Sequence, residues 1–195
     1  MQFEDKRSKR PQESDHYDSR WWVVNILKEE VEKIKKLGAE RNRFGNSKGW
    51  KTKAPNEGSL YHEVGLAGEY AASLVLNQRI ASITGEIEHL RSGDLLGGIE
   101  VKTSLGDEPS KWDLSARASA IKGMEERVFV HCIGCWWPEY MVVTGWAYGK
   151  EILASTKTRF APHLPDEKVF FLEQSKLKDI NSLFDRFAEL RKRKA

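Results

Sequence analysis

The sequence predicts an α/β fold in which helices flank a central β-sheet. Two observations support this prediction. Apolar residues recur at helical spacing in residues 20–38, 59–76 and 177–187. Residues 127–137 and 140–148 are instead rich in Val, Phe, Ile and Trp, as expected for two long antiparallel strands near the centre of a sheet.

The composition favours one globular domain with an anionic partner. The chain has 32 Lys and Arg against 29 Asp and Glu, and basic residues gather in residues 6–10 and 191–194. Residues 1–18 are charged and nearly free of apolar side chains, so we expect a mobile tail there and a single domain over residues 19–195. No stretch approaches the length of a membrane span, and the chain starts without the apolar core of a signal peptide. We therefore expect a cytoplasmic protein with no membrane partner.

The first element is predicted to be a helix over residues 20–38. Its apolar positions are Val23, Leu27, Val31 and Ile34. Gly38 is a natural helix stop. Trp21 and Trp22 stand at its start, and two interpretations of this pair remain open. They either pack on the core or a second subunit, or they stack on nucleic-acid bases.

Residues 39–58 show no period and form the best nucleic-acid contact segment outside the hairpin described below. Basic groups neutralise phosphates, and an aromatic side chain among them can stack on a base. The alternative is an ordinary solvated loop, or a flap that orders on substrate. The candidate contact residues are Arg41, Arg43, Lys48, Trp50, Lys51 and Lys53.

A second helix is predicted from Ser59, a good N-cap residue, to about Leu76. Its apolar stripe comprises Leu60, Val64, Ala67, Ala71, Leu74 and Val75. Glu69 falls opposite this stripe, yet Leu66 and Leu76 lie on the flank of Glu69 and indicate a second covered face. We therefore expect Glu69 to reach a functional site, with His62 as a weaker candidate for substrate contact.

Residues 92–104 predict a catalytic hairpin. Residues 80–90 are expected to supply the first strand or its lead-in. Alternation over residues 99–104 sends Ile99 and Val101 to one face, and Glu100 and Lys102 to the other. Asp94 can oppose Glu100 only if the turn has an odd number of residues. We therefore predict a three-residue loop over residues 96–98, or a bulge with a glycine at positive φ. The structural alternative is a solvated edge hairpin whose charges only maintain solubility.

At these residues the sequence resembles the PD-(D/E)XK nuclease superfamily. Asp94 matches the first acidic position, Glu100 the second and Lys102 the lysine. Glu69 matches a glutamate on the helix ahead of the hairpin, and Gly93 stands where the family often has proline. Glycine at this position lacks the backbone rigidity of proline, but no metal ligand is lost.

The resemblance covers residues 60–104 and runs more loosely to Trp146, which resembles a position seen in phage and bacterial nucleases of the superfamily. It implies a mixed sheet in a restriction-endonuclease-like core and a deoxyribonuclease that uses Mg²⁺ or Mn²⁺. It also implies that Asp94, Glu100 and the Val101 carbonyl hold the metal, and that Glu69 completes a second metal position or holds a metal-bound water. Lys102 is then placed to orient the attacking water. Related resolvases and restriction enzymes are often dimers, so a homodimer is one expected assembly.

The remaining chain predicts smaller elements. We expect a helix over residues 116–121 capped by Ser115, a short helix at 151–154, a loop through Pro162 and Pro165, and a strand at 169–172. Cys132 and Cys135 are interpreted as buried thiols, because zinc needs two more soft ligands and His131 alone does not complete the set.

Three functions compete on these grounds. The first is a metal-dependent deoxyribonuclease whose catalytic residues are Glu69, Asp94, Glu100 and Lys102. The second is a nucleic-acid-binding protein on a nuclease-like fold that does not cut. The third is an interaction protein whose seven tryptophans form an oligomer interface.

Overall fold

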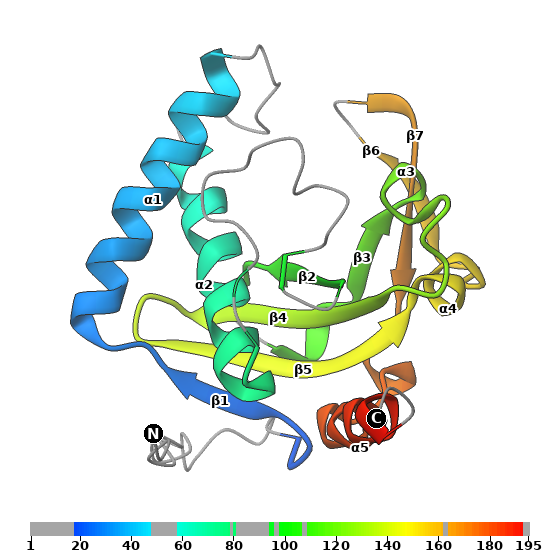
Figure 1. Ribbon diagram of the computed structural model, residues 1–195. Coiled ribbons are helices and arrows are strands. Elements are labelled where there is room, and N and C mark those ends of the chain that lie inside the picture. Colours follow the sequence, from blue (N-terminus) through cyan, green and yellow to red (C-terminus); the bar gives the residue numbers. More distant parts are fainter. Residues whose placement is uncertain are drawn as a thin grey trace.

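The computed structural model describes residues 18–47, 58–78, 80, 94–95, 98–106, 109–161 and 164–192 (Figure 1). The predicted tail at residues 1–18 lies outside these ranges except for Asp18, and the predicted strand at residues 80–90 lies outside them except for Ile80. The elements are β1 (Trp22–Asn25), α1 (Lys28–Ser47), α2 (Gly58–Leu76), β2 (Ile99–Ser104), η2 (Pro109–Lys111), β3 (Leu114–Arg117), α3 (Ala118–Ile121), β4 (Val128–Trp136), β5 (Tyr140–Tyr148), α4 (Gly149–Leu153), β6 (Thr158–Ala161), β7 (Leu164–Leu172), η3 (Gln174–Lys176) and α5 (Ile180–Lys192).

A four-stranded mixed sheet forms the centre of the molecule, in the order β1-β5-β4-β2. The β2–β4 pair is parallel, whereas β4–β5 and β5–β1 are antiparallel. The predicted sheet flanked by helices is therefore present, and β4 and β5 occupy its two central positions as the sequence indicated. A smaller antiparallel sheet, β3-β7-β6, lies beyond β2 and contacts it through β3.

The central sheet is covered on both faces. α2 packs across β2, β4 and β5 and contacts α1 on its other side, so it lies between α1 and the sheet (Figure 1). Ala67 and Ala71 of α2 and Val101 and Val130 of the sheet share this buried cluster. Phe129 and Ala147 belong to a second cluster, formed with the small sheet and α4. Burial of apolar side chains on both faces accounts for the long apolar runs of β4 and β5.

The predicted helix at residues 20–38 was wrong at both ends. Residues 22–25 form β1, because Trp, Val and Val suit a strand and pair with β5. The helix then continues through Gly38 to Ser47. A side chain at Gly38 would place its Cβ 2.9 Å from the backbone nitrogen of Glu63, so this glycine allows α1 and α2 to approach closely. Residues 39–47 of the predicted aperiodic segment are consequently helical.

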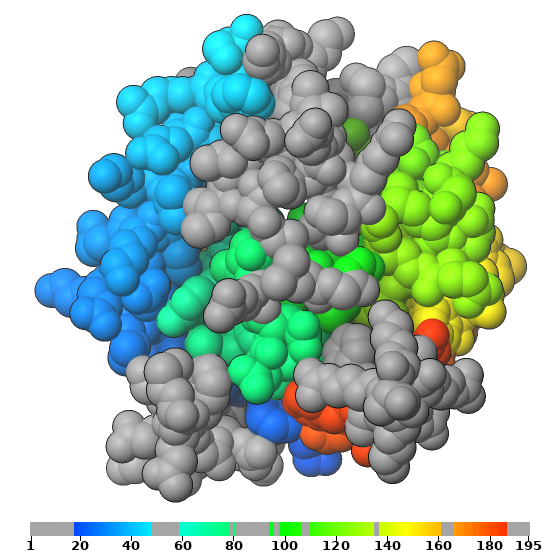
Figure 2. Space-filling view, in the orientation of Figure 1, coloured from blue at the N-terminus to red at the C-terminus, as the bar shows by residue number. Residues whose placement is uncertain are grey.

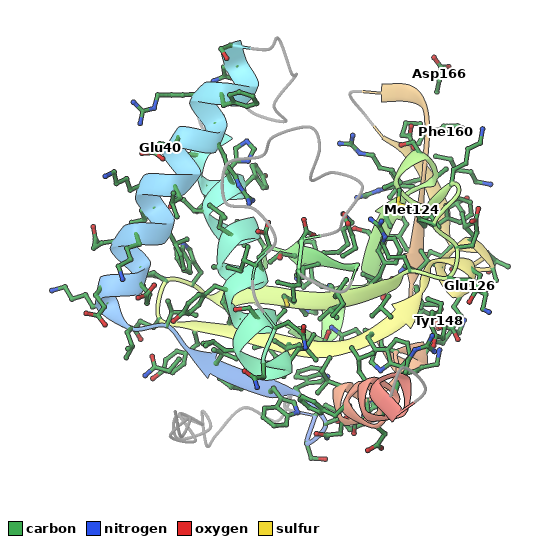
Figure 3. All side chains as sticks on the ribbon, viewed as in Figure 1. Glu40, Met124, Glu126, Tyr148, Phe160 and Asp166 are labelled. Carbon is green, nitrogen blue, oxygen red and sulfur yellow. The ribbon has the colours of Figure 1, made fainter. Side chains whose placement is uncertain are left out.

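The second sheet was also not predicted. Residues 158–161 and 164–172 pair as β6 and β7 where a loop and only a short strand were expected. Ser115 lies inside β3, and Arg117 caps the short α3 instead. In Figure 2 α1 forms one flank of the molecule and the segment around α3 the other. Figure 3 shows Glu40 of α1 and Phe160 of β6 at these opposite margins, and Phe160 is 63% exposed.

The two tryptophans at the start of β1 pack against the protein, as the first interpretation expected. Trp21 is buried with Val23, Ile133 and Val142. The Trp22 ring lies 6.3 Å from that of Phe184 in α5. No helix among the described residues is long and apolar enough to cross a membrane.

Candidate functional site

The hairpin register is the one that brings Asp94 opposite Glu100. Leu95 and Ile99 form an antiparallel bridge, and the Leu95 N–H donates to the Ile99 carbonyl at 3.1 Å. Three residues therefore separate the bridged pair, and the last of them, Gly98, has a φ of 76°. This confirms the predicted loop length and the glycine at positive φ. The next pair outward in this register is Asp94 and Glu100.

The Asp94 carboxylate reaches the outer edge of β2. Its Oδ2 accepts a hydrogen bond of 2.7 Å from the Val101 N–H. On its inner side β2 pairs with β4, so Asp94 satisfies a backbone donor on the side away from β4. Ile80 bridges Leu95 on the far side of this segment. The aspartate is therefore fixed against the strand that carries Glu100 and Lys102.

Glu100 lies between two cationic side chains. The Lys102 ammonium donates to Glu100 Oε1 at 2.6 Å, and the guanidinium of Arg127 lies 3.6 Å from Oε2. Arg127 precedes β4, the parallel neighbour of β2, and sequence analysis did not select it. Its position at the start of a strand predicted to be central was the only signal that pointed to it.

Glu69 comes from α2 and is 6% exposed. Its carboxylate pairs with both terminal nitrogens of Arg41 in α1, at 2.7 and 3.1 Å. A close contact between helix and strand sets the position of α2. A Cβ on Gly68 would lie 2.0 Å from the hydroxyl oxygen of Thr103 in β2. The covered face of α2 that Leu66 and Leu76 predicted is present, since both side chains are buried.

The four predicted catalytic side chains act on one another electrostatically. The pKa of Asp94 is raised to about 7, first by burial and then by the carboxylates of Glu100 and Glu69, while Lys102 and the Val101 N–H oppose this rise. Burial also raises the pKa of Glu69, against the effect of Arg41 and Lys102, while Glu100 acts in the same direction as burial. Glu69 and Asp94 thus both lie in the fields of Glu100 and Lys102. Crowded carboxylates with perturbed pKa values are typical of functional sites.

A buried histidine lies beneath the charged face of β2. His131 of β4 pairs in register with Lys102, and its ring nitrogens contact the hydroxyls of Ser104 at 3.2 Å and Thr144 at 2.9 Å. Burial lowers the pKa of His131 to about 3, with Asp113 opposing. The neutral imidazole therefore links three strands. The sequence offered only one signal, a histidine in an otherwise apolar strand.

The predicted nucleic-acid contact residues are only partly described. Arg41 lies on α1 in the pair with Glu69, and Arg43 is exposed on the same helix. Lys48, Trp50, Lys51 and Lys53 lie outside the described residues. His62 is half-buried, and burial together with Arg41 lowers its pKa. Cys132 is a buried free thiol, as expected, and the side chain of Cys135 is outside the described part.

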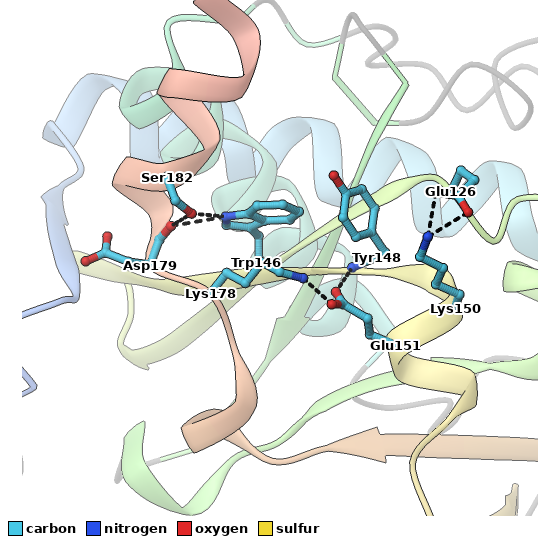
Figure 4. Close-up of polar contacts among 8 residues, drawn as sticks. All are labelled: Glu126, Trp146, Tyr148, Lys150, Glu151, Lys178, Asp179 and Ser182. Carbon is cyan, nitrogen blue, oxygen red and sulfur yellow. Dashed lines mark hydrogen bonds and ion pairs between the residues drawn. The ribbon is translucent and has the colours of Figure 1, made fainter. Parts of the chain in front are cut away.

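A second polar cluster joins β5 to the C-terminal part of the chain (Figure 4). The buried Trp146 donates from Nε1 to the Asp179 carbonyl at 3.1 Å and to the Ser182 hydroxyl at 3.0 Å. Glu151 accepts the Tyr148 N–H at 2.7 Å and pairs with the Lys178 ammonium. These contacts give Trp146 a structural role.

The donor set at β2 fits a hard divalent cation. Mg²⁺ takes one or two carboxylates and keeps several waters, and Asp94 and Glu100 supply two carboxylates beside each other. In the part of the chain that the structure describes, no three His, Cys, Asp or Glu side chains are grouped closely enough to hold a metal ion. Glu69 interacts with the other two carboxylates through its field, while its oxygens contact Arg41.

Comparison with protein-family models, with curated proteins and with solved structures found no match to this chain.

Proposed function

We propose that this protein is a metal-dependent deoxyribonuclease of the PD-(D/E)XK type. One observation carries the proposal: the hairpin register sets Asp94 opposite Glu100, which pairs with Lys102, while the helix that carries Glu69 packs against the same strand. These residues match the superfamily pattern in sequence order. The parallel β2–β4 pair and the antiparallel Leu95–Ile99 bridge support a restriction-endonuclease-like core.

Asp94 and Glu100 hold Mg²⁺ or Mn²⁺ in this proposal, together with the Val101 carbonyl that the resemblance implies. The bound cation activates a water and offsets the charge that develops on a phosphodiester. Lys102 donates a short hydrogen bond to Glu100, and such a donor suits the orientation of a water or a phosphate oxygen. Glu69 on α2 adds a third negative charge that acts on Asp94.

The test is incubation of the purified protein with labelled linear, circular, single-stranded and four-way DNA, with and without Mg²⁺. We expect cleavage of at least one substrate with Mg²⁺, none with a chelator, and none with the Asp94→Ala variant. Circular dichroism checks that this variant is folded. Equal cleavage by wild type and Asp94→Ala, or no cleavage of any substrate by the folded wild type, would contradict the proposal.

A second candidate is a DNA-binding protein on the same fold that does not cut. One observation favours it: each carboxylate of the site already has a partner within the protein. Arg41 pairs with Glu69, Lys102 pairs with Glu100, and the Val101 N–H donates a hydrogen bond to Asp94. This candidate predicts that the same assay gives complexes in a gel shift, unchanged by Mg²⁺, and no products.

A further inference from the structure

The Arg41–Glu69 pair is the most enclosed ion pair at the site. The side chain of Arg41 is 18% exposed and that of Glu69 is 8% exposed. The planar guanidinium contacts both carboxylate oxygens, so the geometry is bidentate. The two residues lie on different helices, α1 and α2, and are 28 positions apart in the chain.

Apolar contacts also hold α1 against α2. Val31 and Ile34 of α1 and Val64 of α2 are buried in one apolar cluster, and Gly38 allows close approach at Glu63. A buried ion pair contributes little to stability compared with apolar residues of the same size, because both charges must be desolvated. The position of the pair suggests another role. Gly68, next to Glu69, lies against Thr103 of β2, so the helix that carries the partner of Arg41 packs on the strand of Glu100 and Lys102.

We propose that Arg41 is a substrate-binding residue that exchanges Glu69 for a phosphate oxygen of the DNA. This inference rests on the proposed nuclease function. A guanidinium binds a carboxylate and a phosphate through the same two-pronged geometry, so either anion satisfies it. In the free protein Glu69 occupies the guanidinium. A divalent cation beside Asp94 and Glu100 neutralises part of the negative charge that attracts Arg41, and a phosphate bound there supplies a replacement anion.

The exchange predicts two effects of opposite sign for Arg41→Gln. Without the guanidinium, Mn²⁺ meets less positive charge and a free Glu69, so its dissociation constant should fall about fivefold. A short DNA duplex loses one bidentate phosphate contact, so its dissociation constant in Ca²⁺ should rise about tenfold. If the ion pair serves only to hold the two helices together, Arg41→Gln should weaken the affinity for both Mn²⁺ and DNA.

Lys36→Gln is the control, since it removes one positive charge from an exposed position on the same helix that is not among the predicted contact residues. We expect it to leave Mn²⁺ binding unchanged and to weaken DNA binding by no more than about twofold. If Arg41→Gln behaves like Lys36→Gln, or loses affinity for both ligands, the exchange does not occur. If the wild type cleaves DNA and binds Mn²⁺ through Asp94 in that case, only this inference fails. A wild type that binds no Mn²⁺ overturns the proposed function as well.

A second variant keeps the test decisive if Arg41→Gln does not fold. Glu69→Gln removes the charged carboxylate that competes with phosphate for Arg41, so DNA binding in the presence of a chelator should tighten about threefold. Glu63→Gln, on the same helix, is the control for the loss of one negative charge. The gain should disappear in the double variant with Arg41→Gln. Equal gains in Glu69→Gln and Glu63→Gln would overturn the inference.

Discussion

The carboxylates of this protein occur in two contrasting clusters. Near β2, Glu69 and Glu100 both influence Asp94, and together with burial they raise its pKa to about 7. In the cluster at β5 and α5, Glu151 pairs with Lys178 and Glu126 with Lys150, and these four side chains are all 35% exposed or more. One cation per carboxylate in contact with solvent is a low-energy arrangement that needs little support from the fold.

The carboxylates near β2 lower the stability of the folded protein. Three carboxylates in one another's fields destabilise the folded state unless protons, cations or ligands offset them. Arg41, Lys102 and Arg127 offset part of this charge. The contrast assigns a structural role to the β5 cluster, and in the function proposed here a divalent cation would offset the charge of the β2 cluster.

Substitution of one lysine in each cluster should separate the two roles most strongly. Lys102→Ala should lower DNA cleavage by roughly a thousandfold, because it removes the donor that orients water or phosphate. Lys178→Ala should leave cleavage within about twofold and lower the free energy of unfolding by about 1 kcal/mol. Cleavage assays and urea unfolding measure both. A large loss of cleavage in Lys178→Ala alone would reverse the assignment.

A smaller effect should follow from the contact that positions α2. Gly68→Ala places a methyl group against the Thr103 hydroxyl and should lower the free energy of unfolding by about 3 kcal/mol. Gly65→Ala is the matched control on the same helix, since its Cβ would meet nothing within 4 Å. It should stabilise the protein by about 0.5 kcal/mol through helix propensity.

Thr103→Ala should restore most of the stability lost in Gly68→Ala, because it removes the clashing hydroxyl. Urea unfolding of the single and double variants measures this recovery. Equal stabilities of the Gly65 and Gly68 variants would show that α2 does not sit on β2 in this way, and the placement of Glu69 would then be wrong.

The smallest of these effects concerns the buried histidine below β2. The pKa of His131 is about 3 in the folded protein, below its ordinary value of 6.5, so the unfolded chain binds the extra proton. The stabilising contribution of the neutral ring is complete above pH 6.5 and is lost as the pH falls toward 3. Between pH 6 and 4.5 it should decrease by about 2 kcal/mol.

Comparison of the wild type with His131→Asn isolates this contribution. The raised pKa of Asp94 acts in the opposite direction over the same pH range, because its protonated form is favoured by folding. The variant should therefore lose less stability than the wild type on acidification, as measured by urea unfolding at each pH. Parallel losses in the two proteins would contradict a buried neutral His131.

Much of the site follows from local rules that a sequence carries. Alternation in residues 99–104 separated Val101 from Glu100 and Lys102, and the odd loop length followed from the need for Asp94 to oppose Glu100. Helical periodicity gave α2 to within a residue. These features depend on neighbours along the chain, so a single sequence is sufficient to predict them.

Features set by contacts between distant segments were not predictable. Gly38 resembles a helix stop in isolation, and only the position of Glu63 explains why the helix continues. Arg41 was predicted as a nucleic-acid contact, and its pairing with Glu69 was not foreseen because that partner lies on another helix. Residues 158–161 form a strand only because β7 pairs with them.

The central claim is that the β2 cluster, and not the β5 cluster, binds a divalent cation. Paramagnetic broadening of backbone amide signals during a Mn²⁺ titration tests it directly, since Mn²⁺ broadens nearby nuclei. We expect the signals of Asp94, Glu100 and Lys102 to broaden first, those of Glu126 and Glu151 to persist, and the effect to vanish in Asp94→Ala. Broadening that begins at Glu126 or Glu151, or none at β2, would contradict the assignment of this edge as a metal-dependent active site.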